Sequence, residues 1–307
     1  MAEDSFVDNH GVRLAVRDYG GSGRSVLLIH GAGRSLADWA LIAPLMARGR
    51  HVVAMDVRGH GRSDEGPWDW ENVLEDTHAV IRSLRLEPVA LVGHSLGGMV
   101  AALYGTRFPG ISAAVNLDGH GKARPDQYVG IPADEIAMKL VQVQAVEELL
   151  RNAPTVTMTA NEADAAREAM KVRLDAAGIG GVGTEVFDRT LAVRPDGNVE
   201  IRPTSETTRP LLACVEELDV FALYRRVACP LLVYQALRPG PVPPGLPDWW
   251  DAAMAAYRLG LTRDLEAVAR DHPHVEVQSI DATHALILEE PHLIVEQLDS
   301  FLDRNGA

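Results

Sequence analysis

Short apolar stretches alternate with longer amphipathic stretches over the first 118 residues of the chain. The apolar stretches predict strands, and the amphipathic stretches, with apolar residues three or four positions apart, predict helices. The expected strands are residues 12–18, 25–30, 51–56, 88–93 and 112–117, and the expected helices are residues 36–46, 70–84 and 96–108. Strands that alternate with helices are typical of a mostly parallel sheet covered by helices, so the pattern predicts an α/β fold.

The pattern changes between residues 119 and 226, where strands and helices no longer alternate regularly. Residues 133–152 and 161–177 have the apolar spacing of helices. Residues 191–203 hold a PDGN turn signal between alternating residues, which fits a small hairpin and a surface loop equally well. We therefore predict a mainly helical lid (cap) subdomain at residues 119–226, inserted into an α/β core domain made of residues 1–118 and 227–307.

The alternation of strands and helices resumes after the lid. We expect strands at residues 230–235 and 274–280, and helices at residues 249–269 and 291–303. A loop rich in proline and glycine, residues 238–247, follows the first of these strands. The last third of the chain is thus predicted to complete the sheet that the first third begins.

The composition is that of a globular protein that acts on small molecules. With 307 residues, 47% of them hydrophobic and 23% charged, the chain has ordinary proportions and enough length to bury a full-size core. Its net charge of −14 repels nucleic-acid phosphates and anionic lipid headgroups. We therefore expect a small-molecule substrate, with neither nucleic acid nor membrane as partner. Nothing in the pattern predicts an oligomeric state.

The N-terminal residues, MAEDS, lack the basic start and apolar stretch of a secretory signal. Cys214 and Cys229 form no CxxC pair, so they predict neither a disulfide framework nor a metal cluster. The glycine run at residues 20–23 lacks the Lys-Ser/Thr of a phosphate-binding loop. We expect a cytoplasmic protein with no metal and no cofactor.

The most informative motif is GHSLG at residues 93–97, a G-x-S-x-G sequence between an apolar strand and a helix. Glycines flank the serine because the turn is so tight that side chains there would collide with the adjoining strand and helix. Such a turn lifts the Ser95 hydroxyl above the sheet, which predicts that Ser95 is a nucleophile. The N–H of Leu96, at the start of the helix, is the expected first donor of an oxyanion hole.

Two further motifs follow neighbouring strands. In HGAG at residues 30–33, Gly31 and Gly33 let the backbone approach a substrate, and the N–H of Ala32 is the expected second oxyanion donor. Taken alone, this motif would be an ordinary glycine turn. In DVRGHGRSD at residues 56–64, we expect Asp56 and Arg58 to tie turns together beneath the site rather than to take part in catalysis.

Together with ATHALILEEP at residues 282–291, these motifs resemble those of the α/β-hydrolase superfamily, over about residues 10–118 and 228–303. The resemblance implies an α/β-hydrolase fold and a serine hydrolase with a catalytic triad. It also implies that the base is His284, which follows a strand and precedes the last helix. It does not identify the substrate, because this fold carries many chemistries.

The acid of the triad departs from the usual pattern. Most members of the superfamily place it just after the strand written here as residues 230–235, but this chain has ALRPG there and no carboxylate before Asp248. A subset, including haloalkane dehalogenases and some lactonases, takes the acid from the end of the strand after the nucleophile helix. Asp118 occupies that position, so it is our first candidate, with Asp248 as the alternative and Asp219 behind it. Asp281 is a poorer choice, because it lies only three residues before His284.

A serine nucleophile argues against the dehalogenase and epoxide-hydrolase branches, which require a carboxylate at that position. We predict hydrolysis of a carboxylic ester or lactone of a small, largely apolar molecule. Trp39 and Trp249 are further candidates for substrate binding, at the pocket entrance. The apolar preference rests on lid residues Ile136, Met138, Leu140, Val141, Leu149, Met158 and Met170.

Two other functions stay open. The same scaffold supports hydrolysis of a carbon–carbon bond or a non-hydrolytic lyase or acyl-transfer reaction. A non-catalytic ligand-binding receptor is the alternative from another class. The missing acid after residues 230–235 favours the receptor, whereas the intact Ser95 and His284 argue against it.

Overall fold

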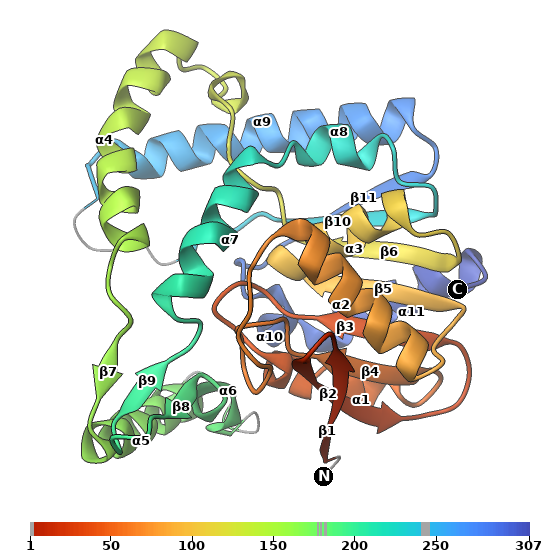
Figure 1. The fold of residues 1–307 in the computed structure, drawn as a ribbon. Coiled ribbons are helices and arrows are strands. Elements are labelled where there is room, and N and C mark those ends of the chain that lie inside the picture. Colours follow the sequence, from red (N-terminus) through yellow and green to blue (C-terminus); the bar gives the residue numbers. More distant parts are fainter. Residues whose placement is uncertain (1–2, 177, 179, 181–182, 241–245) are drawn as a thin grey trace.

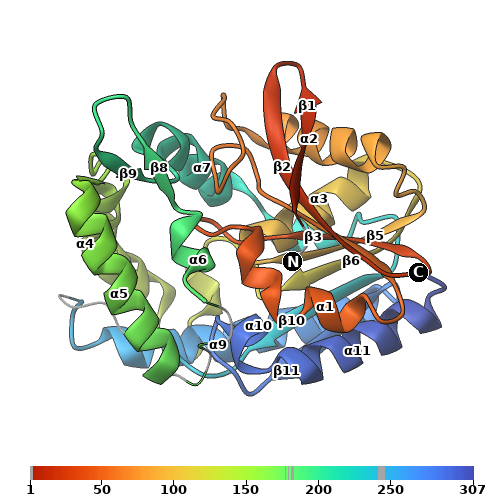
Figure 2. The same cartoon turned by 90° about the horizontal axis from the view of Figure 1, so that it is seen from below.

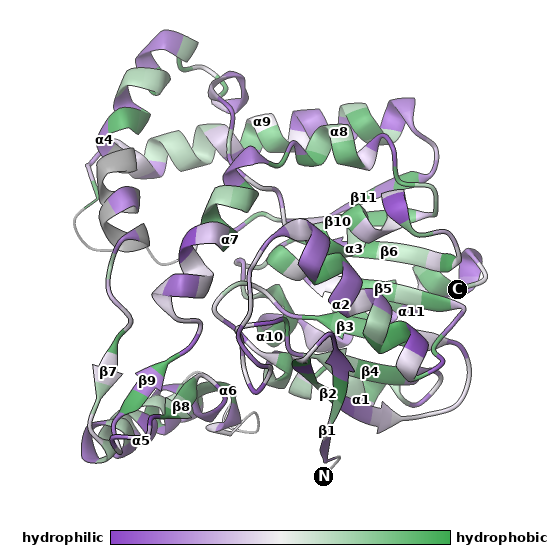
Figure 3. Cartoon of the chain, in the orientation of Figure 1, coloured by the Kyte–Doolittle hydropathy of each residue, from purple (hydrophilic) through white to green (hydrophobic). Residues whose placement is uncertain are grey.

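The computed structural model describes residues 3–176, 178, 180, 183–240 and 246–307. In this part of the chain a central eight-stranded sheet has the order β1-β2-β4-β3-β5-β6-β10-β11 (Figure 1). Its strands are β1 (Asp4–Asn9), β2 (Val12–Gly20), β3 (Ser25–Ile29), β4 (His51–Met55), β5 (Val89–His94), β6 (Ile111–Leu117), β10 (Leu231–Ala236) and β11 (Val275–Ile280). The inner strands are apolar along their length, as the colouring of Figure 3 shows.

Most of the sheet is parallel. The exceptions are β1 and β2, which form an antiparallel hairpin, and the antiparallel pairing of β2 with β4. All pairs from β4 to β11 are parallel. The α/β fold with a mostly parallel sheet is thus confirmed, although the first strand was not predicted, because most of its residues are polar or exposed.

Helices cover both faces of the sheet (Figure 2). One face packs against α2 (Trp70–Ser83), α3 (Leu96–Arg107), α8 (Val220–Tyr224) and α9 (Trp250–Asp271). The other packs against the 3-10 helix η1 (Leu36–Ala40), α1 (Ala43–Met46), α10 (Leu286–Glu289) and α11 (Pro291–Arg304). The helix predicted over residues 36–46 is therefore two short helices. Pro44 lies in the first turn of α1, and proline has no N–H to donate to an earlier turn.

The segment between β6 and β10 holds the predicted lid. It contains the 3-10 helix η2 (Pro125–Gln127), α4 (Ala133–Arg151), α5 (Ala160–Ala176), α6 (Glu185–Asp188) and α7 (Ser205–Glu217). Residue 177, the end of one predicted helix, lies outside the described residues. Of the two alternatives for residues 191–203, the structure has the hairpin: β8 (Leu191–Val193) pairs with β9 (Val199–Ile201), and β7 (Thr157–Met158) adds a third strand. Helix α7 was not predicted, and it contains Pro210.

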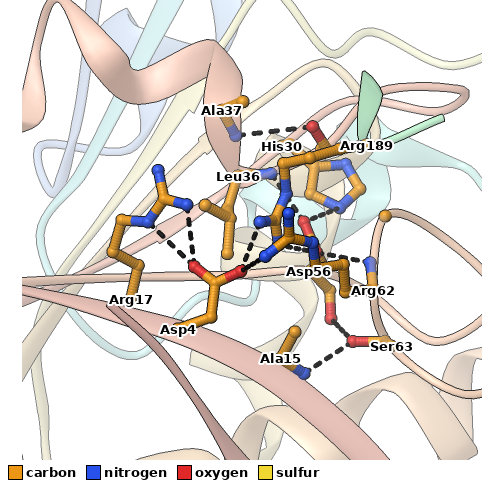
Figure 4. A network of polar contacts seen from close by, with 12 residues as sticks. Asp4, Ala15, Arg17, His30, Leu36, Ala37, Asp56, Arg62, Ser63 and Arg189 are labelled. Carbon is orange, nitrogen blue, oxygen red and sulfur yellow. Dashed lines mark hydrogen bonds and ion pairs between the residues drawn. The ribbon is translucent and has the colours of Figure 1, made fainter. Parts of the chain in front are cut away.

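A buried ionic cluster joins the segment between β6 and β10 to the central sheet (Figure 4). Arg189, which follows α6 and is 0% exposed, pairs with Asp4 of β1 and with Asp56, the residue after β4. Arg17 of β2 lies 2.8 Å from the same Asp4 and also binds Glu185 of α6. Because both arginines bridge elements that are far apart in the sequence, they hold α6 and the residue after it against the sheet.

None of the helices in the described residues is long and apolar enough to span a membrane.

Candidate active site

Ser95 stands at a strained turn between β5 and α3. Its φ of 54° and ψ of −115° place its backbone in a region that residues other than glycine rarely adopt. The flanking glycines make the turn possible. A Cβ on Gly93 would lie 2.0 Å from the backbone of Gly97, and a Cβ on Gly97 would lie 2.1 Å from the carbonyl oxygen of Ile29. The backbone geometry is therefore that of the nucleophile turn expected from G-x-S-x-G.

The predicted base and the predicted acid lie in contact. His284 follows β11, Asp118 follows β6, and Nδ1 of His284 is 2.7 Å from Oδ2 of Asp118. A carboxylate only accepts hydrogen bonds, so Nδ1 carries the proton and donates it. In the neutral imidazole this arrangement leaves Nε2 as the acceptor, the form that a general base requires.

Asp118 also receives two hydrogen bonds on its second oxygen. Nε2 of His120 lies 3.2 Å from Oδ1, and the amide N–H of Ala236, the last residue of β10, donates to the same atom at 2.9 Å. Burial by itself raises the pKa of Asp118, but the hydrogen bonds from His120, His284 and Ala236 outweigh it and hold that pKa well below its usual range. Asp118 is therefore ionised at neutral pH and is fixed from three sides.

The other acid candidates are placed elsewhere. Asp248 is exposed and immediately precedes Trp249, the cap of α9. The Asp281 side chain is 87% exposed and lies 3.6 Å from Arg238. Asp219 caps α8 by accepting the N–H of Ala222. Among these carboxylates, Asp118 is the one that the described structure brings to His284.

The predicted oxyanion donors flank Ser95. Leu96 begins α3, and the first N–H groups of a helix have no partner within the helix. Ala32 belongs to the HGAG turn, which approaches the nucleophile closely: a Cβ on Gly31 would lie 3.2 Å from the Cβ of Ser95. The two amides therefore stay our candidates for the donors of an oxyanion hole.

Buried histidines support these turns. His30 donates from Nδ1 to the carbonyl of Gly31 at 2.7 Å and accepts the N–H of Val57 at Nε2, 3.0 Å away, so it links the HGAG turn to the turn after β4. Nε2 of His94 lies 2.8 Å from the carbonyl oxygen of His284 and donates to it. Burial lowers the pKa of His30 to about 3 and that of His94 to about 4, so both are neutral at pH 7.

Asp56 and Arg58 tie turns together beneath the site. Asp56 accepts the N–H of Leu36 at 2.7 Å and that of Arg62 at 2.8 Å. Arg58 binds the buried Asp76 through two nitrogens, at 2.6 and 2.7 Å, and donates to the carbonyl of Pro67. The Asp56–Arg62 stretch therefore has a scaffold role, and neither side chain lines the cavities described next.

Two cavities meet at Ser95. The first, of about 340 Å³, lies on the side of the HGAG turn and α10. The second, of about 300 Å³, lies on the side of Asp118, His120 and α9. Ser95, His284 and Gly240 line both cavities. A substrate with its reacting carbonyl at Ser95 thus has space for one group on each side of the serine.

Only some of the predicted substrate-binding residues line these cavities. Gly31 lines the first one, whereas Gly33, with φ +70°, lies in the same turn but lines neither. Trp39 is 0% exposed within the core, and Trp249 packs beside Tyr128. Trp39 therefore fills the core instead of forming a pocket entrance, because a large aromatic side chain buries much apolar area there. Trp249 is partly buried and lines neither cavity.

The lid residues expected to give an apolar pocket do not line either cavity. Ile136 is buried in a small cluster with Tyr128, whereas Met138 is 68% and Val141 61% exposed. The Leu149 side chain lies outside the described residues. The apolar lining comes from the core domain instead, through Met99, Met254, Leu261, Ile287 and Leu288.

Sequence reasoning missed His94 and His120 as supporting residues. His94 lies inside the G-x-S-x-G motif, and His120 stands two residues after Asp118. The nearness of His120 to a candidate acid was the available signal. The sequence alone does not show the role of His120, because it is the turn after β6 that brings the His120 ring back to the Asp118 carboxylate.

In the described residues, no group of three or more His, Cys, Asp or Glu side chains is arranged to hold a metal ion. Both cysteines, Cys214 and Cys229, are free thiols.

Comparison with known proteins places this geometry in context. The model of the alpha/beta hydrolase family matches residues 26–297. An uncharacterized protein of Mycobacterium tuberculosis is 34% identical over 147 residues, which are 45% of this chain and 42% of that protein. The matched stretch thus spans less than half the length of this relative.

A longer match comes from Dechloromonas aromatica. Its 2-hydroxy-6-oxononadienedioate/2-hydroxy-6-oxononatrienedioate hydrolase 1 is 26% identical over 66% of this chain and 72% of that protein. Among solved structures, E-2-(acetamidomethylene)succinate hydrolase superposes with a TM-score of 0.71 at 19% identity, over 99% of this chain and 100% of that one. The family match and this superposition confirm the α/β-hydrolase fold that the motifs predicted.

Proposed function

Because this chain belongs to the alpha/beta hydrolase family, we propose that it is a serine hydrolase that cleaves a carboxylic ester or lactone through a Ser95-His284-Asp118 triad. The observation that carries the proposal is the 2.7 Å contact between His284 Nδ1 and Asp118 Oδ2 beside the strained Ser95 turn. A mostly buried, ionised carboxylate that orients a histidine in the same cavities as a serine on a strained turn fits a catalytic triad.

The reaction follows from these positions. Nε2 of His284 takes the hydroxyl proton as Ser95 Oγ attacks the substrate carbonyl carbon. The N–H groups of Ala32 and Leu96 stabilise the negative oxygen of the tetrahedral intermediate. Its collapse breaks the bond to the leaving oxygen, which receives the proton from His284 and departs as an alcohol. Water, deprotonated by the same histidine, then releases the acid and regenerates Ser95. Throughout, Asp118 holds the imidazole in the correct tautomer and stabilises its positive charge.

The size and lining of the cavities support a small substrate. Their volumes of about 340 and 300 Å³ are at the lower end of ligand pockets. Ile287 and Leu288 provide apolar contact in the first cavity, and Met99, Met254 and Leu261 provide it in the second. We infer a small molecule with an apolar body, and we expect it to be the only kind of partner that this site binds.

A second candidate is hydrolysis of a carbon–carbon bond beside a keto group. The observation that favours it is the name of the D. aromatica relative, a hydrolase of an oxo-dienedioate, which contains no ester. Both reactions need the same nucleophile, base and oxyanion donors. They differ in the leaving group, which is a carbon acid in one case and an alcohol in the other.

The proposed function is tested with a fluorophosphonate probe and two panels of substrates. We expect the probe to label Ser95, as identified by peptide mass spectrometry, and we expect the protein to hydrolyse p-nitrophenyl acetate to octanoate or simple lactones. Ser95→Ala should abolish both labelling and turnover while the circular dichroism spectrum stays unchanged. Turnover of 6-oxo-dienoates alone would instead support the second candidate.

A ligand-binding receptor predicts the opposite result. In that case the probe would leave Ser95 unlabelled, and Ser95→Ala would change no measured rate. Residual activity of the Ser95→Ala protein equal to that of the wild type would disprove the triad assignment.

A further inference from the structure

Arg258 differs in its ion pairing from the other arginines at the two cavities. Three arginines line them: Arg34 in the first, and Arg238 and Arg258 in the second. Arg34 is paired with Asp38 at 2.7 Å, and Arg238 pairs with Glu289 and lies 3.6 Å from Asp281. The Arg258 guanidinium has no ion pair or hydrogen bond with any described residue. It is therefore the cation that is available to a ligand.

The main chain at Arg258 is fixed to the strand that supports the acid. The carbonyl of Arg258 accepts hydrogen bonds from Gln235 Nε2 at 2.9 Å and from Thr262 Oγ1 at 3.0 Å. The Thr262 hydroxyl also lies 2.8 Å from Gln235 Oε1, so the two side chains clamp this turn of α9. Gln235 is 0% exposed and immediately precedes Ala236, whose N–H donates to Asp118. Arg258 is thus held at a fixed place relative to the triad.

The surroundings of Arg258 suit an anionic group on an apolar body. The second cavity is lined by Met99, Met254 and Leu261 as well as by the triad residues. A half-buried guanidinium without a partner loses hydration and gains no counter-ion, which costs free energy until an anion binds. Although the chain has a net charge of −14, a cation without a partner among the described residues, in a cavity that Ser95 also lines, favours anionic over neutral ligands there.

We propose that Arg258 binds a carboxylate group of the substrate, so that the molecule hydrolysed at Ser95 carries a negative charge in the cavity lined by α9. This inference rests on the proposed function and makes its substrate class more specific. The planar guanidinium matches a carboxylate through two parallel N–H donors, and such charge-assisted pairs are stronger than neutral hydrogen bonds. Arg258 is therefore a specificity-determining residue, which acts on the substrate and not on the triad.

The test compares matched pairs of esters in which only the charge differs. One pair is mono-4-nitrophenyl adipate and its methyl ester, with the carboxylate in the acyl part. The other is 4-butyryloxybenzoate and its methyl ester, with the carboxylate in the leaving group. We expect Arg258→Gln to lower kcat/KM for at least one of the two acids by about 10- to 100-fold and to leave both methyl esters within about 3-fold. Arg258→Lys should recover part of the loss, because lysine keeps the positive charge but lacks the two parallel N–H donors of the guanidinium.

Arg263→Gln is the control on the same helix. Arg263 is 52% exposed, pairs with Asp264 at 2.7 Å and lines neither cavity, so its loss should affect acids and methyl esters equally. The inference is overturned if Arg258→Gln leaves both acids unchanged, or if it lowers an acid and its methyl ester by the same factor.

A binding measurement separates this inference from the proposed function. If the wild type hydrolyses none of the four esters, no p-nitrophenyl ester and no lactone, the proposed function fails, and calorimetric titration of Ser95→Ala with hexanoate and hexanamide then tests Arg258 directly. Hexanoate binding that weakens about 10-fold in Ser95→Ala/Arg258→Gln, with no change for hexanamide, supports the carboxylate site. Equal hexanoate binding in the two variants, or none in either, rules it out.

Discussion

His284 and Asp118, 166 positions apart in the sequence, meet at 2.7 Å although they follow strands that are not neighbours. Asp118 follows β6, His284 follows β11, and β10 lies between these two strands in the sheet. The intervening strand ends at Ala236, which has no carboxylate but donates its amide N–H to Asp118. In most members of the superfamily the acid follows the strand that corresponds to β10. Here β10 instead donates a hydrogen bond to an acid that follows the neighbouring strand, β6.

The first prediction concerns the identity of the acid. Asp118→Asn should lower kcat by about 10⁴-fold, because the amide no longer stabilises the imidazolium and favours the wrong tautomer of His284. Asp248→Asn is the matched control: Asp248 is exposed next to α9, and we expect less than a 2-fold change, on the order of other surface substitutions. Steady-state hydrolysis of a p-nitrophenyl ester measures both. A large loss in Asp248→Asn with activity kept in Asp118→Asn would reverse the assignment.

The second prediction concerns His120 as a positioning residue for Asp118. Its Nε2 lies 3.2 Å from Oδ1, and this hydrogen bond contributes to the low pKa of the Asp118 carboxyl. His120→Phe should lower kcat by about 10-fold with little change in KM, the loss typical of a hydrogen bond to a charged group. His120→Gln, whose amide also donates, should restore most of kcat. If both variants raise KM and keep kcat, His120 contacts the substrate and does not position the acid.

The third prediction concerns the buried ionic cluster between lid and core. Arg189→Met leaves Asp4 and Asp56 buried without one of their cations, so we expect the free energy of unfolding to fall by about 3 kcal/mol. Urea denaturation followed by circular dichroism measures the change. Arg194→Met is the control: Arg194 is 43% exposed and pairs with Glu200, so its loss should cost less than about 1 kcal/mol. Equal effects of the two substitutions would show that Arg189 does not hold the lid in place.

The fourth prediction concerns the pH dependence of stability. Burial lowers the pKa of His30 and of His60 to about 3 and that of His94 to about 4, against an ordinary value of 6.5. The unfolded chain therefore binds protons at these positions at a higher pH than the folded chain does. Stability is fully present above about pH 6.5 and falls as the pH drops towards 4.

Between pH 7 and pH 5.5, each of these three histidines should lower the free energy of unfolding by about 1 kcal/mol. Urea denaturation at several pH values measures this slope, and this range lies above the region in which the aspartates with lowered pKa titrate. His60→Asn removes one titrating group and should flatten the slope by about a third. A wild-type free energy that stays constant from pH 7 to pH 5.5 would contradict the neutral state of these histidines.

Several features were predictable because they depend on local sequence. The apolar runs at residues 25–30 and 88–93 define inner strands, since a strand buried on both faces must be apolar throughout. The turn at Ser95 follows from Gly93 and Gly97, because backbone approaches near 2 Å leave no room for a Cβ at either position. The family resemblance then indicated His284. The cytoplasmic location and the absence of a nucleic-acid partner stay predictions.

Tertiary structure decided what depends on residues far apart in the chain. The choice of Asp118 over Asp248 required the order β6-β10-β11, which brings one carboxylate to His284 and leaves the other exposed. The same holds for Trp39, which is buried in the core, and Met138, which is exposed. The sequence does not show whether an apolar residue lines a pocket, fills the core or lies on the surface, because that depends on tertiary packing. The sequence likewise does not show that Arg258 lacks a partner among the described side chains, since ion pairs form between side chains that folding brings together.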